Sequence, residues 1–509
     1  DEMTPRALLA LHERLCRARA YPASAEELAA TRRLLAGFSA RRDLRRSAER
    51  LADSGIAGTP IRYRFYWPMA RWLARRYPAL LGIDWSDPEF EPRLAAALDL
   101  LAGRGEAEAI RRLRPTARRA IERLRDRSET DAAFVIRRLE ALPGGDRIRE
   151  AIHDAIDVAY RLEGSPSGPS RTLAEHRGAP IVFGPPPARS RPRLRAEIAR
   201  APQAVRALDR AEGTRLVDLA REAMVTRARD LDAFAHGDPR DVRLVDDGGG
   251  LAFALIGVVP SRRLFLPAVY GALTLRNGVP IGYVQLDVLL GNAELSFNMF
   301  ETFRGGEAGS VFARLLAAAH HVFGVRSFSI EPYQLGRGND EGIDSGAWWF
   351  YARFGFRPRG GPVARLARSE LARRARDPRH RSSRATLLRL AEAHLHWAID
   401  PRRPGIVTPI ESIGLAAASS SRRGPSAREA MRRLGVPSVR GWSADERLWL
   451  ERWAPLIEAV PGIERWSPSA RRGLVRIVRA KGGRRESAYA RLFDAHGQWV
   501  EAVLALGIR

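Results

Sequence analysis

The sequence is poor in two reactive residue types. Its 509 residues include one cysteine, Cys16, which excludes an internal disulfide and a cysteine-based zinc cluster. They also include one lysine, Lys481, among 85 basic residues. Arginine in place of lysine throughout indicates the codon bias of a GC-rich genome of bacterial type, and it carries no functional information.

Long hydrophobic runs and metal-binding patterns are missing as well. The best apolar run, residues 251–259, has the length of a strand and not of a membrane span. Residues 1–15 lack the charged-then-apolar layout of a signal peptide. The spacing of His320 and His321, and of His394 and His396, does not suit a helical metal pair. We therefore expect a cytoplasmic protein with no membrane partner and no metal.

Charge is unevenly distributed along the chain. The formal net charge is +26, and such an excess favours polyanions such as nucleic acid through counterion release. Between residues 245 and 359, however, ten arginines are balanced by ten acidic residues. The basic excess therefore lies on the flanks of an electrically neutral segment, as expected if that segment belongs to a distinct domain.

Composition divides the chain into six parts. Its length is too great for one compact core, and its hydrophobic content of 45% is that of a globular protein. Capping-box-like starts at Ser24 and Ser128 mark helices near the N-terminus. Stretches rich in proline, glycine and serine mark linkers. The parts are a helical region at 1–163, a linker at 164–193, a domain at 194–360 with a helical lead-in at 194–235, a helical extension at 361–400, a linker at 401–425 and a helical region at 426–509.

The neutral segment carries the alternation typical of strands. The turn signals Asn277-Gly278 and Gly291-Asn292 predict that the last three of four strands form an antiparallel meander. The expected elements, in order, are strands at 251–259, 268–275, 280–290 and 293–301, a helix at 307–323, a strand at 326–331 and a helix at 345–354.

The loop after the fourth strand has little side-chain bulk. It reads Arg304-Gly-Gly-Glu-Ala-Gly309. Free N–H groups and the positive end of the helix dipole attract anions, and glycine allows a phosphate to approach closely. The loop therefore predicts a phosphate site. A tight strand-to-helix turn, in which Glu307 stabilises the helix dipole, is the alternative that the sequence leaves open.

The strand before this loop has two different faces, because apolar and polar residues alternate along it. The apolar face comprises Leu295, Phe297 and Met299, and the polar face comprises Glu294, Ser296 and Asn298.

A short aromatic helix is the second distinctive segment. It reads Ala347-Trp-Trp-Phe-Tyr351-Ala-Arg-Phe-Gly355-Phe356, and Gly355 with Pro358 shortly after it end the helix. This segment matches the Ala-x-x-x-Tyr-x-x-x-Gly-Phe pattern of the GNAT superfamily of acyl-CoA N-acyltransferases. The loop at Arg304 resembles the Arg/Gln-x-x-Gly-x-Gly/Ala loop of the same family.

The resemblance covers about residues 245–359 and implies both a fold and an activity. The implied fold is α+β, a GNAT-like mixed and largely antiparallel sheet with packed helices, here flanked by mainly helical N- and C-terminal regions. The implied activity moves an acyl group from acetyl-CoA, or another acyl-CoA, to an amine without a metal. The acceptor, a small molecule or a peptide, leaves no mark on the sequence.

The resemblance also implies a role for each candidate residue. Tyr351 would return a proton to the departing thiolate, and Glu294 would deprotonate the amine. The candidates for binding the cofactor are Met299, Arg304, Gly305, Gly306 and Gly309. The candidates for binding the acceptor are Ser296, Asn298 and Tyr333. A core tyrosine and a solvated strand face are the structural alternatives for Tyr351 and Glu294.

Two residues depart from the family pattern. Glu307 stands where the loop has glycine, and Asp344 stands where family members often have asparagine. These departures favour a second hypothesis, in which a GNAT-like scaffold has lost its cofactor and its basic helical flanks bind nucleic acid or a protein. A nucleic-acid-modifying acyltransferase would combine the two hypotheses.

Overall fold

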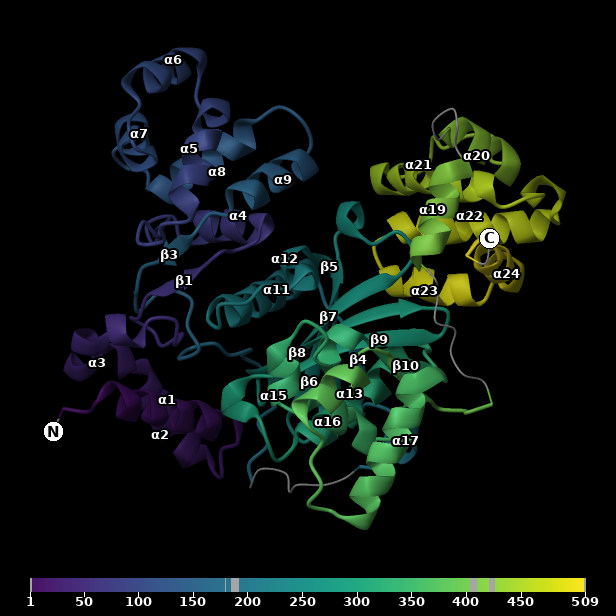
Figure 1. Ribbon diagram of the computed structural model, residues 1–509, viewed down its shortest axis with the longest axis horizontal. Coiled ribbons are helices and arrows are strands. Elements are labelled where there is room, and N and C mark those ends of the chain that lie inside the picture. Colours follow the sequence, from purple (N-terminus) through teal and green to yellow (C-terminus); the bar gives the residue numbers. More distant parts are fainter. Residues whose placement is uncertain (1, 179, 185–191, 403–409, 421–425, 508–509) are drawn as a thin grey trace. The chain divides into compact units, whose positions relative to one another are not determined.

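The computed structural model describes residues 2–178, 180–184, 192–402, 410–420 and 426–507, so parts of both predicted linkers lie outside the described residues. With 54% helix and 14% strand, the protein has the mixed α+β structure that the sequence predicts. It divides into two compact units (Figure 1). The first comprises Asp1–Pro185, Arg215–His236 and Arg276–Pro280, and the second comprises Pro186–Thr214, Gly237–Leu275 and Ile281–Arg509.

Capped amphipathic helices dominate the first unit. Ser24 caps α2 by accepting a hydrogen bond from the backbone N–H of Glu27. Thr130 caps α8, so this helix begins two residues later than a cap at Ser128 would place it. The helices are α1 (Pro5–Ala20), α2 (Ala25–Ala36), α3 (Arg42–Ser47), α4 (Trp67–Arg76), α5 (Phe90–Leu101), α6 (Arg104–Leu113), α7 (Ala117–Leu124), α8 (Asp131–Ala141), α9 (Asp146–Ile156), most of α11 (Arg210–Val225), and α12 (Asp232–Ala235).

The first unit also contains a small antiparallel sheet that the sequence did not predict. Its strand order is β1-β3-β2, with β1 (Ile61–Tyr63), β2 (Leu81–Ile83) and β3 (Tyr160–Leu162). Strands of three residues are too short to show alternation. They form here because their partners come from distant parts of the chain.

An eight-stranded sheet forms the base of the second unit. Its strand order is β11-β10-β9-β8-β7-β6-β5-β4, so strands that follow one another in the chain also pair. Asn277 and Gly278 both have positive φ angles, as the predicted hairpin turn requires. The strands are β4 (Ala204–Ala207), β5 (Gly237–Gly248), β6 (Leu251–Val258), β7 (Ala268–Arg276), β8 (Val279–Leu289), β9 (Asn292–Met299), β10 (Ser327–Ile330) and β11 (Leu395–Ala398).

Three of these strands differ from the sequence-based prediction. β4 and β11 lie within segments predicted to be helical, and β5 replaces a predicted turn region. All four residues of β4 are exposed, so this strand has no alternation of buried and exposed residues from which it could be predicted. In β5, Pro239 and a register shift between Gly237 and Val242 hide the strand, because a bulge interrupts the alternation.

The strands β9 and β10 run parallel and then part. Their register ends at the pair Glu294 and Ser329. β9 nevertheless continues to pair with β8 as far as Met299. β10 likewise pairs with β11 as far as Ile330. One edge of β9 beyond Glu294 is therefore not paired with β10.

The apolar face of β9 packs against α13 (Ala308–Phe323) and α16 (Ala347–Arg353). The ring of Phe297 lies 5.2 Å from that of Phe312 and 5.9 Å from that of Phe350. This confirms the predicted division of β9 into an apolar and a polar face. The remaining helices of this part are α10 (Leu194–Ala199), α14 (Pro332–Leu335), α15 (Asp340–Asp344), α17 (Gly361–Arg376) and α18 (Arg384–Leu390).

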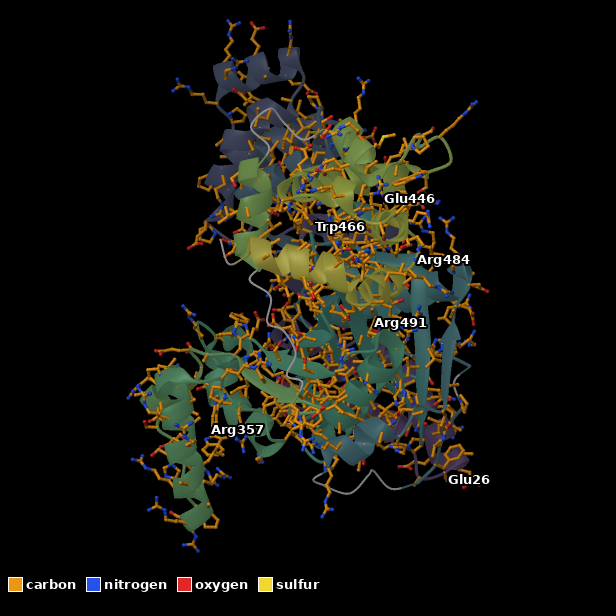
Figure 2. The ribbon with its side chains drawn as sticks, turned by 90° about the vertical axis from the view of Figure 1, so that its right-hand side faces the viewer. Glu26, Arg357, Glu446, Trp466, Arg484 and Arg491 are labelled. Atoms are coloured by element: carbon orange, nitrogen blue, oxygen red, sulfur yellow. The ribbon has the colours of Figure 1, made fainter. Side chains whose placement is uncertain are left out.

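The C-terminal helices belong to the same compact unit as the sheet. Arg491, which is labelled in Figure 2, donates to the carbonyl oxygens of His321 and Val322 at the end of α13. Trp449 and Trp453 donate their indole N–H groups to the carbonyls of Pro260 and Phe265. The helices are α19 (Ile410–Ser420), α20 (Ala427–Leu434), α21 (Ala444–Ala459), α22 (Pro468–Gly482), α23 (Glu486–Asp494) and α24 (Gly497–Leu506).

The single lysine of the chain fastens these helices to the loop before β7. Lys481 is fully buried, as is its ion-pair partner Glu486 at 2.5 Å. Its ammonium group also donates to the carbonyls of Leu266 and Pro267 and lies 4.3 Å from the ring centre of Tyr489. Burial lowers the pKa of Lys481 to about 8, and Glu486 opposes that shift. A compact ammonium with three donors suits this enclosed site better than a planar guanidinium does.

Among the described helices, none combines the length and hydrophobicity needed to cross a membrane.

The substitution Lys481→Met tests how much the ion pair between Lys481 and Glu486 contributes to stability. It removes the nearer of two cations beside the buried carboxylate of Glu486 and leaves only Arg263, at 3.7 Å, so we expect the free energy of unfolding to fall by about 3 kcal/mol, the lower end of the cost of breaking a buried ion pair. Urea unfolding followed by tryptophan fluorescence measures the change. Adding Glu486→Gln should recover part of the loss. The control Arg432→Met, which removes an exposed ion pair with Glu429 on α20, should change stability far less, and equal losses would contradict a special role for Lys481.

Candidate functional site

A pocket of about 760 Å³ lies at the end of β9. Three segments form most of its wall: the end of β9, the glycine loop with the first turn of α13, and one face of α16. The lining residues are Pro192, Phe297, Asn298, Met299, Arg304, Gly305, Gly306, Ala308, Gly309, Gln334, Asn339, Glu341, Gly342, Ser345, Ala347, Phe350, Tyr351, Arg353 and Phe354.

The glycine loop presents backbone to this pocket. Gly305 has a φ angle of +120°, which disfavours any residue with a Cβ. The N–H of Gly309 lies in the first turn of α13, where helix geometry provides no intrahelical acceptor. Glu307 is 5% exposed and is not one of the lining residues. The carboxylate that departs from the family pattern is therefore buried outside the pocket wall.

Arg304 bridges two sides of the pocket mouth. Its Nε donates to the carbonyl oxygen of Met299 at 3.2 Å, which holds the side chain against the end of β9. Its terminal nitrogen pairs with the carboxylate of Glu341, and both side chains are nearly half exposed. Solvent screening makes this pair weak, so an anion entering the pocket can compete with Glu341 for Arg304.

Tyr351 places a buried phenol beside the free edge of β9. Its side chain is 3% exposed and packs among the rings of Phe312, Phe350 and Phe356. Burial raises the pKa of this phenol, and a hydrogen bond with the backbone of Phe297 opposes the rise. The phenol therefore stays protonated at neutral pH and can donate a proton into the pocket.

The opposite face of the sheet carries two rows of polar side chains. The register aligns Asp287 of β8, Glu294 of β9, Ser329 of β10 and His396 of β11 in the first row. The second row comprises the paired residues Gln285 and Ser296, together with Glu331 and His394, which lie just outside the ends of β10 and β11. We refer to these eight residues as the polar rows.

Hydrogen bonds and charge link the members of the polar rows. His394 lies 3.2 Å from the Glu294 carboxylate, which also accepts a hydrogen bond from Ser329 at 3.4 Å. The pKa of Asp287 is raised to about 7, chiefly by burial and in smaller part by the nearby carboxylates Glu294 and Glu331, while a hydrogen bond from Gln285 opposes the shift. No group of three His, Cys, Asp or Glu side chains within the described ranges is arranged to hold a metal ion.

The structure brings most of the predicted site residues together. Met299, Arg304, Gly305, Gly306, Gly309, Asn298 and Tyr351 all line the pocket. Glu294 and Ser296 lie on the opposite face of the sheet, within the polar rows. Tyr333 is 53% exposed and does not line the pocket. Asp344, the second departure from the family pattern, is exposed and pairs with Arg384.

Sequence reasoning missed several residues of the site. Pro192 and Gln334 reach the pocket from distant segments, and nothing in their local sequence marks them. The sequence predicts a helix at residues 361–400, on which His394 and His396 would not share a face. Their spacing of two places both on one face of a strand, so recognising β11 was the missing step.

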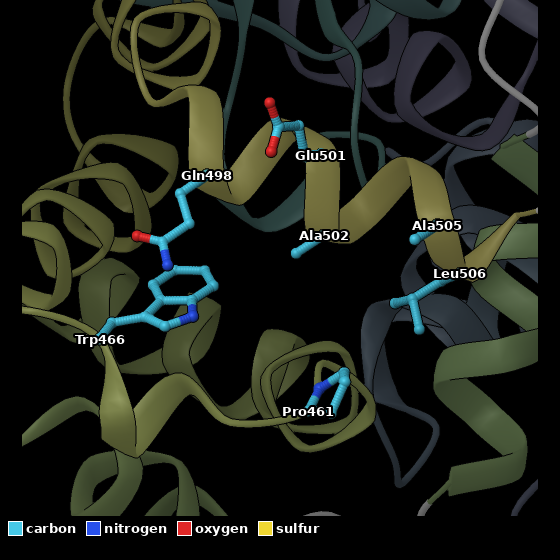
Figure 3. A pocket seen from close by; sticks show the side chains of 7 residues that line it. All are labelled: Pro461, Trp466, Gln498, Glu501, Ala502, Ala505 and Leu506. Carbon is cyan, nitrogen blue, oxygen red and sulfur yellow. The ribbon is translucent and has the colours of Figure 1, made fainter.

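A second pocket, of about 280 Å³, lies among the C-terminal helices. In Figure 3, the side chains of Trp466 and Gln498 lie next to each other on one side of it, and Leu506 lies on the other. None of the predicted site residues reaches it. Its remaining lining residues are Pro461, Glu501, Ala502 and Ala505, which bring no nucleophile, imidazole or cation together.

The raised pKa of Asp287 predicts how stability depends on pH. An acid whose pKa is about 7 in the folded state and 3.8 in the unfolded state holds more protons when folded. Its contribution to stability is therefore largest at low pH and is lost as pH rises toward 7. Asp287→Asn removes this loss, so its stability advantage over wild type should grow by about 1–3 kcal/mol between pH 5 and pH 8.

Urea denaturation at several pH values measures this difference. The matched control is Glu451→Gln, since Glu451 is an exposed carboxylate on α21. The free energy of unfolding of this control should depend on pH in the same way as that of wild type. If the free energy of unfolding of Asp287→Asn also depends on pH as that of wild type does, the pKa of Asp287 is not raised by folding.

Comparison with known proteins identified no relative of the chain. No protein-family model matches the chain, and neither a curated protein nor a solved structure matches it.

Proposed function

We propose that the protein is an acyl-CoA-dependent N-acyltransferase with a GNAT-like core, and that it uses acetyl-CoA in the cytoplasm. The parting of β9 and β10 beside a glycine loop carries this proposal. It leaves strand backbone, helix N-terminus and a buried phenol around one pocket. These three features supply what the transfer of an acyl group from a thioester requires.

The residues of the pocket suit an acyl-CoA. A volume of about 760 Å³ is within the range of cofactor sites. The loop at Gly305 and the first turn of α13 would hold the pyrophosphate through backbone N–H groups, with Arg304 supplying positive charge. The edge of β9 near Met299 would hold the pantetheine arm. The bound thioester supplies an activated acyl carbonyl and a thiolate leaving group.

The chain's own groups account for the remaining steps. The amine nitrogen attacks the acyl carbonyl, and backbone donors at the free edge of β9 stabilise the developing oxyanion. When the carbon–sulfur bond breaks, Tyr351 gives its proton to the thiolate. Glu294 takes a proton from the amine through water, because it lies on the opposite face of the strand. The products are an amide and free CoA.

A second candidate function rests on the basic flanks. Arg365, Arg368 and Arg376 of α17, together with Arg379 and Arg389, are exposed and form no ion pair with other residues in the described part of the chain. A segment with this many unpaired arginines favours a polyanion such as RNA. A scaffold that binds nucleic acid without acyl transfer would need only these flanks.

Calorimetry with acetyl-CoA separates the two candidates. We expect wild-type protein to bind acetyl-CoA, and Arg304→Ala to weaken binding by about tenfold, the effect of losing one charge-assisted phosphate contact. Glu341→Gln should strengthen binding, because it removes the competitor for Arg304. The control Arg389→Ala removes an exposed arginine outside the pocket and should leave binding unchanged. Absence of binding at saturating acetyl-CoA would refute the enzyme and leave the scaffold.

Substitution of Tyr351 tests the proton donor. Tyr351→Phe keeps the packed ring and removes the phenolic proton, so kcat should fall about 100-fold while acetyl-CoA affinity stays within a few-fold. Thiol release, measured with a chromogenic disulfide across a panel of primary amines, reports turnover. Tyr333→Phe changes an exposed tyrosine outside the pocket and serves as the control. Unchanged turnover in Tyr351→Phe would remove the residue from the mechanism.

A further inference from the structure

Positive charge is concentrated in and around α17, directly after the neutral segment. Residues 360–389, which comprise α17, α18 and the turns beside them, contain nine arginines and two acidic residues. One of these acids, Glu370, is buried. The other, Asp377, accepts a hydrogen bond from the backbone N–H of Arg379. The surface of this segment is therefore strongly cationic.

The inner side of α17 is fixed to the core that carries the pocket. The buried carboxylate of Glu370 accepts hydrogen bonds from His380 at 2.8 Å and from Ser382 at 2.5 Å. Ser382 in turn accepts a hydrogen bond from the indole N–H of Trp349 on α16 at 3.1 Å. The guanidinium of Arg374 lies 4.8 Å from the centre of the same indole. α17 is thus an anchored insertion between α16 and β11, and its outer face has a fixed orientation relative to the core.

The outer face of α17 has small residues at its centre and arginines around them. With about 3.6 residues per turn, Ser369 and Ala372 lie at the middle of this face. The surrounding arginines are Arg365 and Arg376 toward its two ends, and Arg368 and Arg373 on its two sides. All six residues are exposed. The two end arginines are about 16 Å apart along the helix axis, so the face is long enough to meet several phosphates of a duplex.

The charges on this face repel one another. Arg365 and Arg368 are neighbours on the helix surface, as are Arg373 and Arg376, and like charges at such spacing destabilise a helix. Arg373 pairs with the buried Glu370 at 2.9 Å. The other three arginines form no ion pair with any residue that the structure describes. A bound polyanion would therefore relieve repulsion that the protein alone does not.

The side chains of this segment favour a duplex over other polyanions. No large hydrophobic side chain is exposed between residues 361 and 384, all of which the structure describes. A helix that binds lipid needs an apolar face, and a protein interface needs an apolar centre. Proteins that bind single strands stack bases on exposed aromatic rings. The arginines are thus suited to rows of phosphates on a double helix.

From this arrangement we propose that α17 binds double-stranded DNA in the major groove, without reading its sequence. The groove is about 12 Å wide and admits an α-helix, whereas the major groove of an RNA duplex is deep and narrow. The small residues at the centre of the face allow close approach, and the arginines around them reach phosphates on both sides. This inference rests on the second candidate function, since it names the partner of the basic flank. It is compatible with acyl transfer, because none of the six residues lines the pocket.

Fluorescence anisotropy of the full chain with a labelled DNA duplex of about 20 base pairs tests the proposal. The triple variant Arg365→Ala, Arg368→Ala, Arg376→Ala removes three cations and keeps the helix, because alanine is the best helix former. We expect it to bind DNA about 100-fold more weakly than wild type at about 0.1 M salt. The slope of log K against log salt should fall in magnitude by about 2.7, which is about 0.9 for each lost phosphate contact.

The matched control is the triple variant Arg112→Ala, Arg119→Ala, Arg123→Ala. These arginines are exposed on α6 and α7 of the first unit, and they too form no ion pair with a described residue. The control loses the same net charge, so it separates a binding face from a general effect of charge. Its DNA affinity should stay within about threefold of wild type, because salt screens distant charges. Both triple variants should bind acetyl-CoA as wild type does.

Four outcomes would overturn the proposal. Equal losses of DNA affinity in the two triple variants would show that binding follows net charge and not α17. Equal affinity for DNA and RNA duplexes of the same length would contradict binding in the major groove. Tighter binding of single-stranded RNA than of duplex DNA would leave the second candidate function without this partner. Tighter binding of anionic lipid vesicles, lost in the α17 variant, would identify a membrane surface instead.

The result for DNA is separate from the result for acetyl-CoA. If acetyl-CoA binds and DNA does not, the acyltransferase stands and this inference fails. If DNA binds through α17 and acetyl-CoA does not, the DNA-binding face stands and the acyltransferase fails.

Discussion

The parting of one parallel strand pair is the constraint on which the rest of the second unit depends. Backbone N–H and C=O groups need partners, and a sheet normally provides them on both edges of an inner strand. β9 loses its partner on one edge after Glu294 although β10 lies next to it in the sheet. Two side chains hydrogen-bond to this unpaired edge instead. The phenol of Tyr351 forms a hydrogen bond with the backbone of Phe297, and Arg304 donates to the carbonyl oxygen of Met299. Both contacts come from the segments that surround the pocket.

The two faces of β9 have different electrostatic environments, and this difference separates two kinds of chemistry. On one face, aromatic rings surround Tyr351, and burial keeps its phenol protonated. On the other, three carboxylates and two imidazoles share the polar rows, and burial raises the pKa of Asp287. The buried phenol and the carboxylates therefore do not share one environment. One strand keeps them apart because successive side chains point to opposite faces.

Buried charge also fixes the surroundings of the sheet. Arg314 of α13 pairs with Asp247 of β5 at 2.6 Å, and both side chains are almost fully buried. Arg263 donates to the carbonyls of Lys481 and Gly483, beside the Lys481–Glu486 pair. Buried pairs of this kind contribute specificity more than net stability, since desolvation offsets much of the attraction. We interpret them as fixing the orientation of helices that the sheet alone would not determine. Much of the arginine excess nevertheless remains exposed on the flanks.

The sequence by itself determined the elements of the site that depend on local chemistry. The order of strands from residue 251, the helix at α13, the two faces of β9 and the end of α16 near Gly355 all follow from alternation, turn residues and capping, which act over a few residues. The sequence also located the glycine loop and Tyr351, and the structure places both on one pocket.

Only the tertiary structure decided which of these parts meet. The small sheet of the first unit, the edge strand β4 and the strand β11 are too short to leave a pattern, and they form because distant segments offer hydrogen-bond partners. The burial of Glu307 and the pairing of Asp344 with Arg384 likewise depend on neighbours that no spacing reveals. The polar rows are the clearest case. Their residues come from four strands or from positions next to a strand end, and they acquire a common environment only through register. The raised pKa values of Asp287 and Glu331 and the lowered pKa of His396 are therefore a property of the sheet and not of any one segment.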